Sequence, residues 1–318
     1  MVTLAFCDAF VLTTILVTCF RNIMVPFPNI SPEIFSIELF GINLALRWYA
    51  VSYILGFICA LRLMKFFVVR EYLWASEKPP LSKDEAESFI TYLILGVIIG
   101  GRLGYVLFYN LEYYSLNPIA IFRIWDGGMA FHGGFIGVIA AVILFCWANK
   151  LLLWPTADLI AISTPPGLLF GRLANFINAE LWGRPTEAYW GVIFPGDLAQ
   201  QCQGAIEPCA RHPSQLYEAG LEGILLFIVL IYISFKGGFK KPGLLTGIFF
   251  FGYGASRFLV EYFRVPDPQF FSDGNPYGFA IKLGDYGITM GQALSIPMII
   301  VGLFLSFRSL LSEENLRT

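Results

Sequence analysis

Seven apolar segments of roughly twenty residues recur along the chain, at 49–64, 89–108, 128–148, 157–177, 216–234, 244–263 and 288–307. A helix needs about that length to cross about 30 Å of hydrocarbon. Charged residues make up only 14% of the chain, which excludes an ordinary water-soluble domain. The alternation typical of a transmembrane barrel is missing. We therefore predict an all-α, polytopic transmembrane helical bundle with seven spans.

Lysines indicate how such a bundle is oriented. They gather in the loops after the first, third and fifth segments: Lys65, Lys78, Lys83, Lys150, Lys236, Lys240 and Lys241. Because basic residues favour the cytoplasmic side, we predict that these loops and the tail 308–318 are cytoplasmic. The long loop 178–214 then forms a small external head. Three arginines oppose this bias unless they have another role: Arg123, Arg184 and Arg211.

Residues 1–33 form an apolar extension and lead-in to the predicted spans. Met1–Phe20 is apolar enough to be a further helix, although it contains Asp8. It lacks the basic start of a secretory signal, since Arg21 follows the apolar stretch. Two interpretations stay open, an eighth N-terminal helix and an unprocessed or misassigned start. We treat residues 34–307 as one domain, because no internal repeat is visible.

Four charged residues lie within or at the edges of predicted spans, Arg102, Arg172, Arg257 and Glu261. A charge at the bilayer centre costs about 2.5–3.5 kcal/mol even on a lenient scale, so such residues usually have a function. The alternative is that they pair with one another to fix helix packing, or extend to the interface.

Two of these arginines belong to local polar patterns. Asn175 and Glu180 follow Arg172 by about one and two turns, so a helix that continues that far has all three on one face. Arg102 is flanked by glycines that let a neighbouring helix approach closely: Gly100, Gly101 and Gly104.

A third pattern is the stripe Tyr253, Arg257, Glu261 and Arg264, which must face protein or water and not lipid. Arginine at this depth suits a phosphate, because its planar fork donates paired hydrogen bonds and stays ionised. The nearest phosphate is a lipid head group. We therefore predict that the arginines of three helices, Arg102 among them, face a shared interior that binds a lipid phosphate.

The chain has two histidines, His132 and His212. His132 stands among glycines at the start of the third segment, where two roles stay open. In one role, the ring only packs and donates a hydrogen bond to a carbonyl. In the other, it transfers a proton at the same membrane depth as the end of the Arg172–Glu180 segment. His212 precedes Pro213 directly before the fifth segment, which favours a role at a helix start.

Charge and cysteine spacing exclude other partners. A net charge of −2 gives no reason to expect nucleic acid or another polyanion. The six cysteines lack the close paired spacings of a zinc or redox site, so we predict no metal.

Taken together, these residues resemble the prolipoprotein diacylglyceryl transferases, bacterial inner-membrane enzymes that start lipoprotein maturation. The run from Gly171 through Gly183 is similar to the signature of that family. Further similar blocks follow the same order and cover roughly residues 34–300: Arg47-Trp48-Tyr49, Gly101–Tyr105, Trp125–Gly134, Arg211–Glu218 and Tyr253–Arg257.

The resemblance implies transfer of the diacylglyceryl group of phosphatidylglycerol to the lipobox cysteine of a prolipoprotein signal peptide, with release of glycerol phosphate and no cofactor. It implies a multi-pass protein of the cytoplasmic membrane whose head and active site face the periplasm. Family positions tied to activity or substrate binding match Tyr49, His132, Arg172, Asn175, Glu180, Gly183, Tyr253, Arg257 and Glu261. Departures from the family pattern are Ala50, Ala174 and Ala179 in place of glycine, together with the extension 1–22.

We expect four of these residues to act in catalysis. Arg172 and Arg257 would clamp the departing phosphate, His132 would accept the thiol proton, and Tyr49 would assist. Glu261 or a tyrosine competes with His132 as the base. The remaining predicted site residues would bind and orient the substrate: Asn175, Glu180, Gly183, Arg102, Tyr253 and Glu261.

Two further questions stay open. Cys202 and Cys209 are close in sequence within a loop assigned to an oxidising compartment, so a disulfide and two free thiols are both open. A transporter or lipid flippase would also need buried arginines, but no inverted repeat is visible. A noncatalytic scaffold gives no reason for arginine, histidine and carboxylate at one depth.

Overall fold

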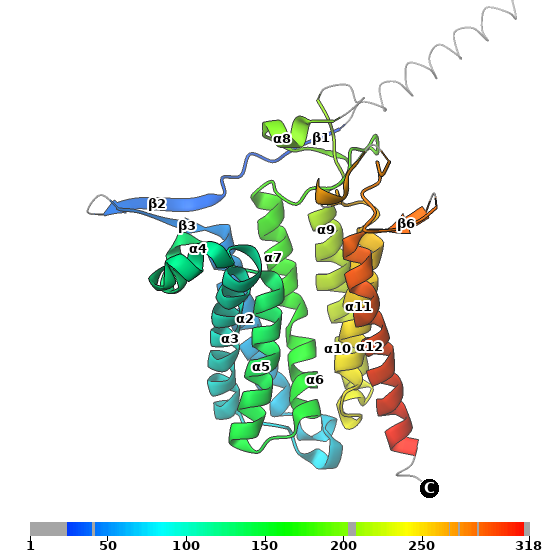
Figure 1. The fold of residues 1–318 in the computed structure, drawn as a ribbon. Helices are drawn as coiled ribbons and strands as arrows, with labels where there is room; N and C mark the ends of the chain where they lie inside the picture. The colour runs from blue at the N-terminus through cyan, green and yellow to red at the C-terminus, as the bar shows by residue number, and fades with distance from the viewer. Residues whose placement is uncertain are drawn as a thin grey trace, which may run out of the picture. The chain divides into compact units, whose positions relative to one another are not determined.

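The computed structural model describes residues 24–39, 42–202, 208–266, 268–272, 274–284 and 286–314, and it is mostly helical, as predicted (Figure 1). The stretch Met1–Phe20 lies outside the described residues. The chain divides into two compact units, which are described one at a time. Unit 1 comprises Met1–Val51, Gly171–Gly220 and Ser256–Ser295; unit 2 comprises Ser52–Phe170, Leu221–Ala255 and Ile296–Thr318.

The main helices follow the predicted apolar segments. Their bounds are α2 Trp48–Val68, α3 Lys83–Tyr109, α5 Phe131–Asn149, α6 Leu153–Ser163, α7 Pro165–Ile177, α9 Ser214–Glu218, α10 Leu226–Phe235, α11 Leu244–Val260 and α12 Met290–Glu314. A π-helical segment, Ala219–Leu225, joins α9 to α10. Five stretches within the described residues are long and apolar enough to cross a membrane: α2, α3, α5, Ser214–Phe235 and Met290–Leu311. Helix α11 is apolar but shorter, at 17 residues.

Several helix ends differ from the predicted ones for local reasons. Helix α3 begins six residues before the expected position 89, because Ser82 and Glu85 form a capping box. Helix α5 begins only at Phe131, because Gly127 and Gly128 have φ angles of +82° and +81°. The predicted segment 157–177 is two consecutive helices, since α7 opens on two prolines that cannot continue the hydrogen bonding of α6.

The expectation of an all-α fold was incomplete, because the described residues also form three small two-stranded sheets. Strands β2 Glu33–Leu39 and β3 Ile42–Arg47 are antiparallel, as are β5 Ile281–Leu283 and β6 Tyr286–Ile288. The third sheet pairs β1 Val25–Pro26 with β4 Val192–Ile193 in parallel. These pairs are two to seven residues long, too short for an apolar pattern to reveal.

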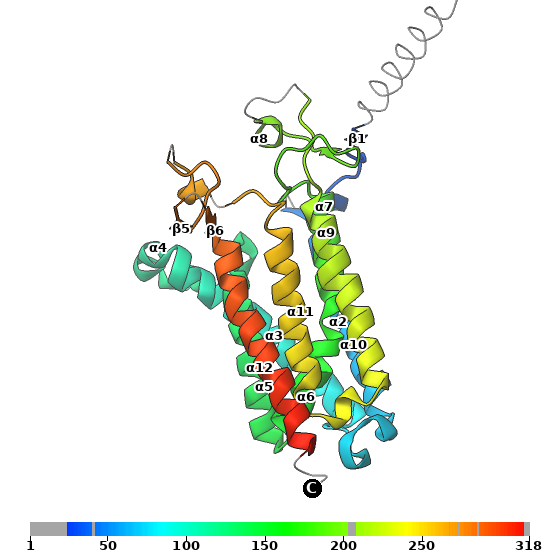
Figure 2. The same ribbon diagram turned by 90° about the vertical axis from the view of Figure 1, so that its right-hand side faces the viewer.

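In unit 2, helices α3 and α5 pack together along a seam of glycines (Figures 1 and 2). A Cβ atom added at Gly96 would lie 2.6 Å from the carbonyl oxygen of Gly137, and one at Gly104 would lie 2.7 Å from Cα of Gly133. The close helix approach expected from the glycines around Arg102 is therefore confirmed. The seam fixes the start of α5, where His132 lies.

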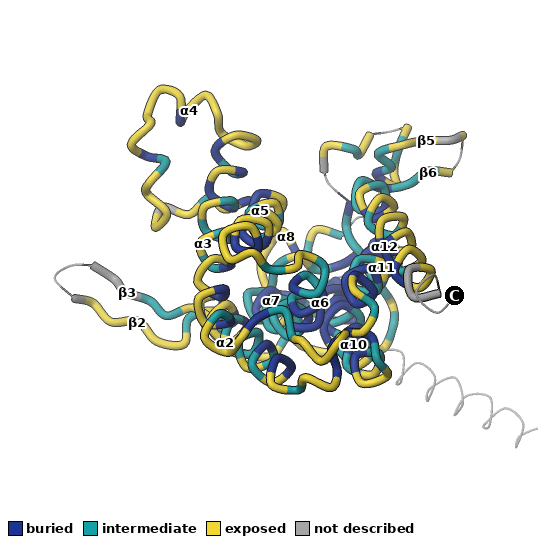
Figure 3. Tube along the Cα trace, turned by 90° about the horizontal axis from the view of Figure 1, so that it is seen from below, coloured by how far each residue is buried: buried dark blue, intermediate teal, exposed yellow. Residues whose placement is uncertain are grey.

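Helix α11 lies between α10 and α12 in Figure 2, again on small residues. A Cβ atom at Gly252 would meet Leu226 of α10, and one at Gly247 would meet Ser306 of α12. The buried Asp158 of α6 caps the start of α11 by accepting hydrogen bonds of 2.7 Å from the main-chain N–H groups of Gly243 and Thr246. In Figure 3, α6 is buried along much of its length, whereas α3 and α5 have exposed apolar outer faces, as a lipid contact requires.

Candidate functional site

Unit 1 holds a cluster of charged side chains centred on Glu218, the last residue of α9. The Glu218 carboxylate is completely buried and forms ion pairs with three arginines. Arg172 of α7 approaches Oε2 at 2.9 Å, and Arg264, just after α11, approaches Oε1 at 2.7 Å. Arg257 of α11 also donates to Oε1. We call these four residues, together with Glu261, the arginine cluster.

Glu261 is the second carboxylate of the arginine cluster. Its Oε2 lies 3.3 Å from Nε of Arg264 and 3.7 Å from Nη2 of Arg257. The hydroxyl of Thr289 donates to its other oxygen over 3.0 Å. Gly291 leaves room for this carboxylate, since a Cβ there would lie 2.6 Å from Oε2. Of the predicted stripe, Arg257, Glu261 and Arg264 come together, although α11 ends at Val260, so Glu261 and Arg264 lie in the turn after the helix.

Tyr49, Asn175 and Glu180 form a second polar group in unit 1. The side-chain amide of Asn175 donates to the Glu180 carboxylate over 2.7 Å and also to the Tyr49 hydroxyl. Helix α7 ends at Ile177, so Glu180 does not lie on a continuing helix as the spacing predicted. Positive φ angles at Ala179 (52°) and Leu181 (55°) turn the chain back instead. Burial raises the pKa of Glu180.

Gly183 lies where three backbone segments of unit 1 meet. Its N–H donates to the carbonyl of His212 over 2.8 Å, and it forms a bridge with Arg264. A Cβ atom at this position would lie 2.8 Å from Cβ of His212 and would also contact the Phe263 carbonyl. Only glycine fits this crossing, so its predicted importance has a packing explanation.

Arg211 and a disulfide secure the loop between α7 and α9 in unit 1. The buried guanidinium of Arg211 donates to the carbonyls of Ala199, Gly183 and Gln201 and stacks over Trp182 at 4.0 Å. This accounts for one of the arginines that opposed the lysine bias. Of the two alternatives left open for Cys202 and Cys209, the structure has the disulfide.

His212 belongs to a hydrogen-bonded chain with Tyr217 and Trp190. The Trp190 indole donates to the Tyr217 hydroxyl over 2.7 Å, and that hydroxyl lies 3.0 Å from Nδ1 of His212. Burial lowers the pKa of His212, because it disfavours the charged ring. The location directly before α9 agrees with the predicted role at a helix start.

The other predicted site residues, His132, Tyr253 and Arg102, belong to unit 2. His132 is exposed in the first turn of α5, with its ring edge-to-face against Phe131. Tyr253 of α11 is buried and stacks on Phe249 at 6.0 Å between ring centroids.

Arg102 of α3 donates hydrogen bonds to the main chain of the loop before α5. Its guanidinium makes five hydrogen bonds, to the carbonyl oxygens of Ile121, Gly127, Gly128, Ala120 and Arg123. A guanidinium has five N–H groups, so these bonds can use all of them. The side chain is also buried, at 4% exposure. This geometry favours a structural role at the loop before α5 over the predicted phosphate contact.

Sequence analysis missed two members of the arginine cluster as site residues, Glu218 and Arg264. Glu218 lies inside the predicted segment 216–234, so the cost of a buried charge that singled out the arginines applies to it equally. Arg264 was visible as the last member of the polar stripe. Both could have been found by listing every charge within or next to a span.

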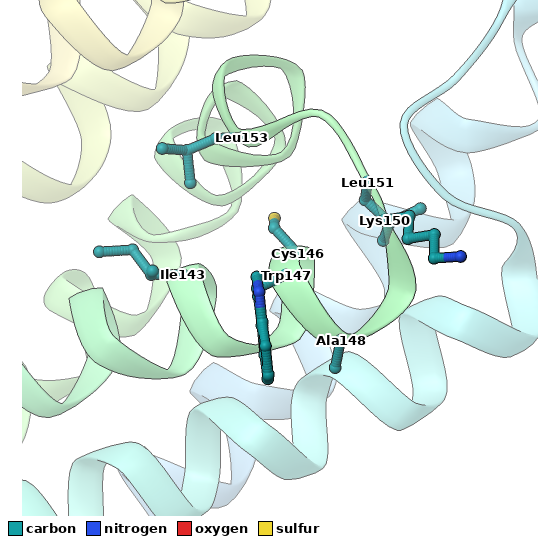
Figure 4. A pocket seen from close by; sticks show the side chains of 7 residues that line it. All are labelled: Ile143, Cys146, Trp147, Ala148, Lys150, Leu151 and Leu153. Atoms are coloured by element: carbon teal, nitrogen blue, oxygen red, sulfur yellow. The ribbon is translucent and has the colours of Figure 1, made fainter.

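Figure 4 shows an open pocket of unit 2. It lies at the end of α5 in unit 2 and is lined mainly by apolar side chains, with Cys146 and Lys150 as the reactive groups. Within the described residues, no group of three or more histidine, cysteine or acidic side chains could hold a metal ion.

Comparison with known proteins identifies the family of this chain. A family model described as prolipoprotein diacylglyceryl transferase matches residues 36–308. A relative from Cereibacter sphaeroides, named phosphatidylglycerol–prolipoprotein diacylglyceryl transferase, is 56% identical over 286 residues, or 90% of this chain and 98% of the relative. Relatives of the same name from Roseobacter denitrificans and Brucella anthropi are 54% and 44% identical, over 90% and 89% of this chain and 97% and 93% of their own lengths. The chain belongs to the prolipoprotein diacylglyceryl transferase family.

Proposed function

We propose that this protein transfers the diacylglyceryl group of phosphatidylglycerol to the thiol of the lipobox cysteine in a prolipoprotein signal peptide. The bond between the diacylglyceryl carbon and the phosphate oxygen breaks, and a thioether bond forms to the cysteine sulfur. Glycerol phosphate leaves with the electron pair of the broken bond. The thiol proton passes to a base of the protein, so the reaction balances without a cofactor.

The convergence of Arg172, Arg257 and Arg264 carries this proposal. Their side chains are 16–19% exposed, so one side of the group is accessible while Glu218 holds the buried side. Fork-shaped guanidinium groups bind a phosphate through paired hydrogen bonds and stabilise the charge that develops as it departs. At membrane depth the anion of a lipid head group would offset part of the cost of burying these cations.

The remaining site residues take supporting roles in this proposal. His132 is our candidate for the base, because it is exposed and histidine exchanges protons near neutral pH. Glu261 or a tyrosine remains the alternative base, whereas arginine is too basic, with a pKa above about 12. Asn175 links Tyr49 to Glu180 and would orient the lipid head group. Gly183 would allow the close packing around it, and Tyr253 would line the lipid.

We further propose seven spans in the bacterial cytoplasmic membrane, with the site on the periplasmic face. Five long apolar helices support a multi-pass membrane protein, and α11 and the consecutive α6 and α7 would supply the other two spans. Cysteines introduced at Glu187 and Lys78 into a cysteine-free variant test this orientation. Only the cysteine at 187 should react with a membrane-impermeant maleimide in intact spheroplasts. Labelling of only the cysteine at position 78 would show that the protein has the opposite orientation.

The transfer itself is tested with purified protein, radiolabelled phosphatidylglycerol and a synthetic lipobox peptide. A thioether-linked diacylglyceryl peptide is the expected product, and the same peptide with serine in place of cysteine should remain unmodified. Movement of labelled lipid across vesicles without any peptide product would favour a flippase. Absence of both the lipidated peptide and lipid movement would indicate a noncatalytic scaffold.

A further inference from the structure

The arginine cluster contains its own internal anion. Glu218 is completely buried and pairs with all three arginines, whose side chains are each less than a fifth exposed. Such a carboxylate cannot meet solvent or substrate without a rearrangement, so it acts on the reaction only through the arginines. Its contacts come from α7, α11 and the segment after α11, so this one carboxylate links all three cations.

Glu218 lowers the positive charge of the arginine cluster by one. The three guanidinium groups pair with Glu218 and Glu261. Without Glu218 the three arginines would have one negative charge fewer beside them. Charges a few ångströms apart inside a protein interact strongly, so a change of one charge alters anion affinity by at least about tenfold.

Binding a phosphate and releasing it make opposite demands on this charge. The substrate is a phosphodiester with one negative charge, whereas the glycerol phosphate product is a monoester that carries up to two near neutral pH. A site of high positive charge would therefore bind the product more tightly than the substrate. A site whose positive charge is limited by a buried carboxylate holds the product less tightly.

We propose that Glu218 is a positioning residue that holds the arginines together and limits their charge, so that glycerol phosphate leaves after transfer. This inference rests on the proposed function, because it assigns the phosphate to the arginine cluster. Its alternative is that Glu218 only fixes the packing of α7, α9 and α11, as buried ion pairs often do.

The decisive variant is Glu218→Gln, which has nearly the same shape and one negative charge fewer. We expect its inhibition constant for glycerol phosphate to fall at least about tenfold. The KM for phosphatidylglycerol should fall with it, while kcat also falls because product release is slower. Titration of glycerol phosphate into the purified variant, followed by calorimetry, measures the same change without any turnover.

Two further variants separate charge from shape. Arg264→Gln lowers the formal charge by one and should weaken glycerol phosphate binding about tenfold. The double variant Glu218→Gln with Arg264→Gln restores the wild-type charge and should return binding to within about threefold of the wild type. Glu187→Gln, which removes an exposed charge from the head loop, is the matched control and should leave both constants unchanged.

Several outcomes would overturn the proposal. One is a Glu218→Gln variant with unchanged affinity for glycerol phosphate and a lower melting temperature, since that is the result of a purely structural ion pair. If this variant does not fold, unchanged binding in Arg264→Gln has the same meaning. Absence of transfer by the wild-type protein would instead contradict the proposed function, and calorimetry would still report whether the cluster binds the anion.

Discussion

The side-chain amide of Asn175 donates a hydrogen bond of 2.7 Å to the carboxylate of Glu180, although the helix that carries Asn175 ends between them. Burial raises the pKa of Glu180, because it disfavours the charged carboxylate. The pair thus holds a carboxylate in place at the edge of the site.

Asn175→Asp should abolish this arrangement, because it sets two carboxylates against each other. We expect transferase activity to fall by about 10²-fold or more at neutral pH. Protonation of the pair relieves the repulsion, so part of the activity should return as the pH is lowered. The matched control is Asn178→Asp, since the amide of Asn178 donates only to the Ala174 carbonyl. A pH-independent loss would contradict this interpretation.

Arg172→Lys should lose most of the activity although it keeps the charge. A lysine ammonium is a point charge and cannot contact Glu218 and a phosphate with the geometry of a forked guanidinium. We expect kcat/KM to fall by about 10²-fold in the peptide transfer assay. Arg123→Lys, at an exposed loop position, serves as the control. Near-normal turnover in Arg172→Lys would remove this residue from the phosphate clamp.

His132→Asn tests the proposed base. Loss of a general base should cost about 10²-fold or more at neutral pH. The defect should shrink as the pH approaches the thiol pKa of about 8.5, where the peptide ionises without help. A pH–rate profile of the variant and the wild type measures this. A small loss that does not vary with pH would instead give His132 a packing role.

Arg102→Gln distinguishes a structural role from a phosphate contact. It removes most of five hydrogen bonds to main-chain carbonyls in the loop before α5. We expect the melting temperature to fall by about 5 °C or more, because buried carbonyls would lose their donors. Arg123→Gln should leave it unchanged. A raised KM for phosphatidylglycerol without loss of stability would restore the phosphate contact predicted from the sequence.

Sequence periodicity predicted the parts of the structure that depend on neighbours along the chain. The contacts of Glu261 with Arg257 and Arg264 are one such part, because residues three and four apart lie close together at a helix end and in the turn that follows it. Helix ends were less predictable where local geometry intervened, as at the prolines that open α7.

Contacts between distant segments could not be predicted in the same way. Glu218 is 46 residues from Arg172 and 46 from Arg264, and nothing in a helical pattern indicates that they pair. The carbonyl partners of Arg102 depend on the path of an irregular loop. The sequence could not decide whether the two cysteines of the loop form a disulfide, because the answer depends on the backbone, which gives them a Cα separation of 6.3 Å.

The glycine seam between α3 and α5 has a consequence for protein engineering. Replacing glycine with alanine inside a helix usually raises stability, by about 1 kcal/mol, because alanine restricts the unfolded chain. Here the added methyl group at Gly96 or Gly104 would occupy space already filled by the backbone of the other helix. A thermostable variant of this enzyme therefore has to be sought on the lipid-facing sides of these helices or in the loops, and the seam has to be left as it is.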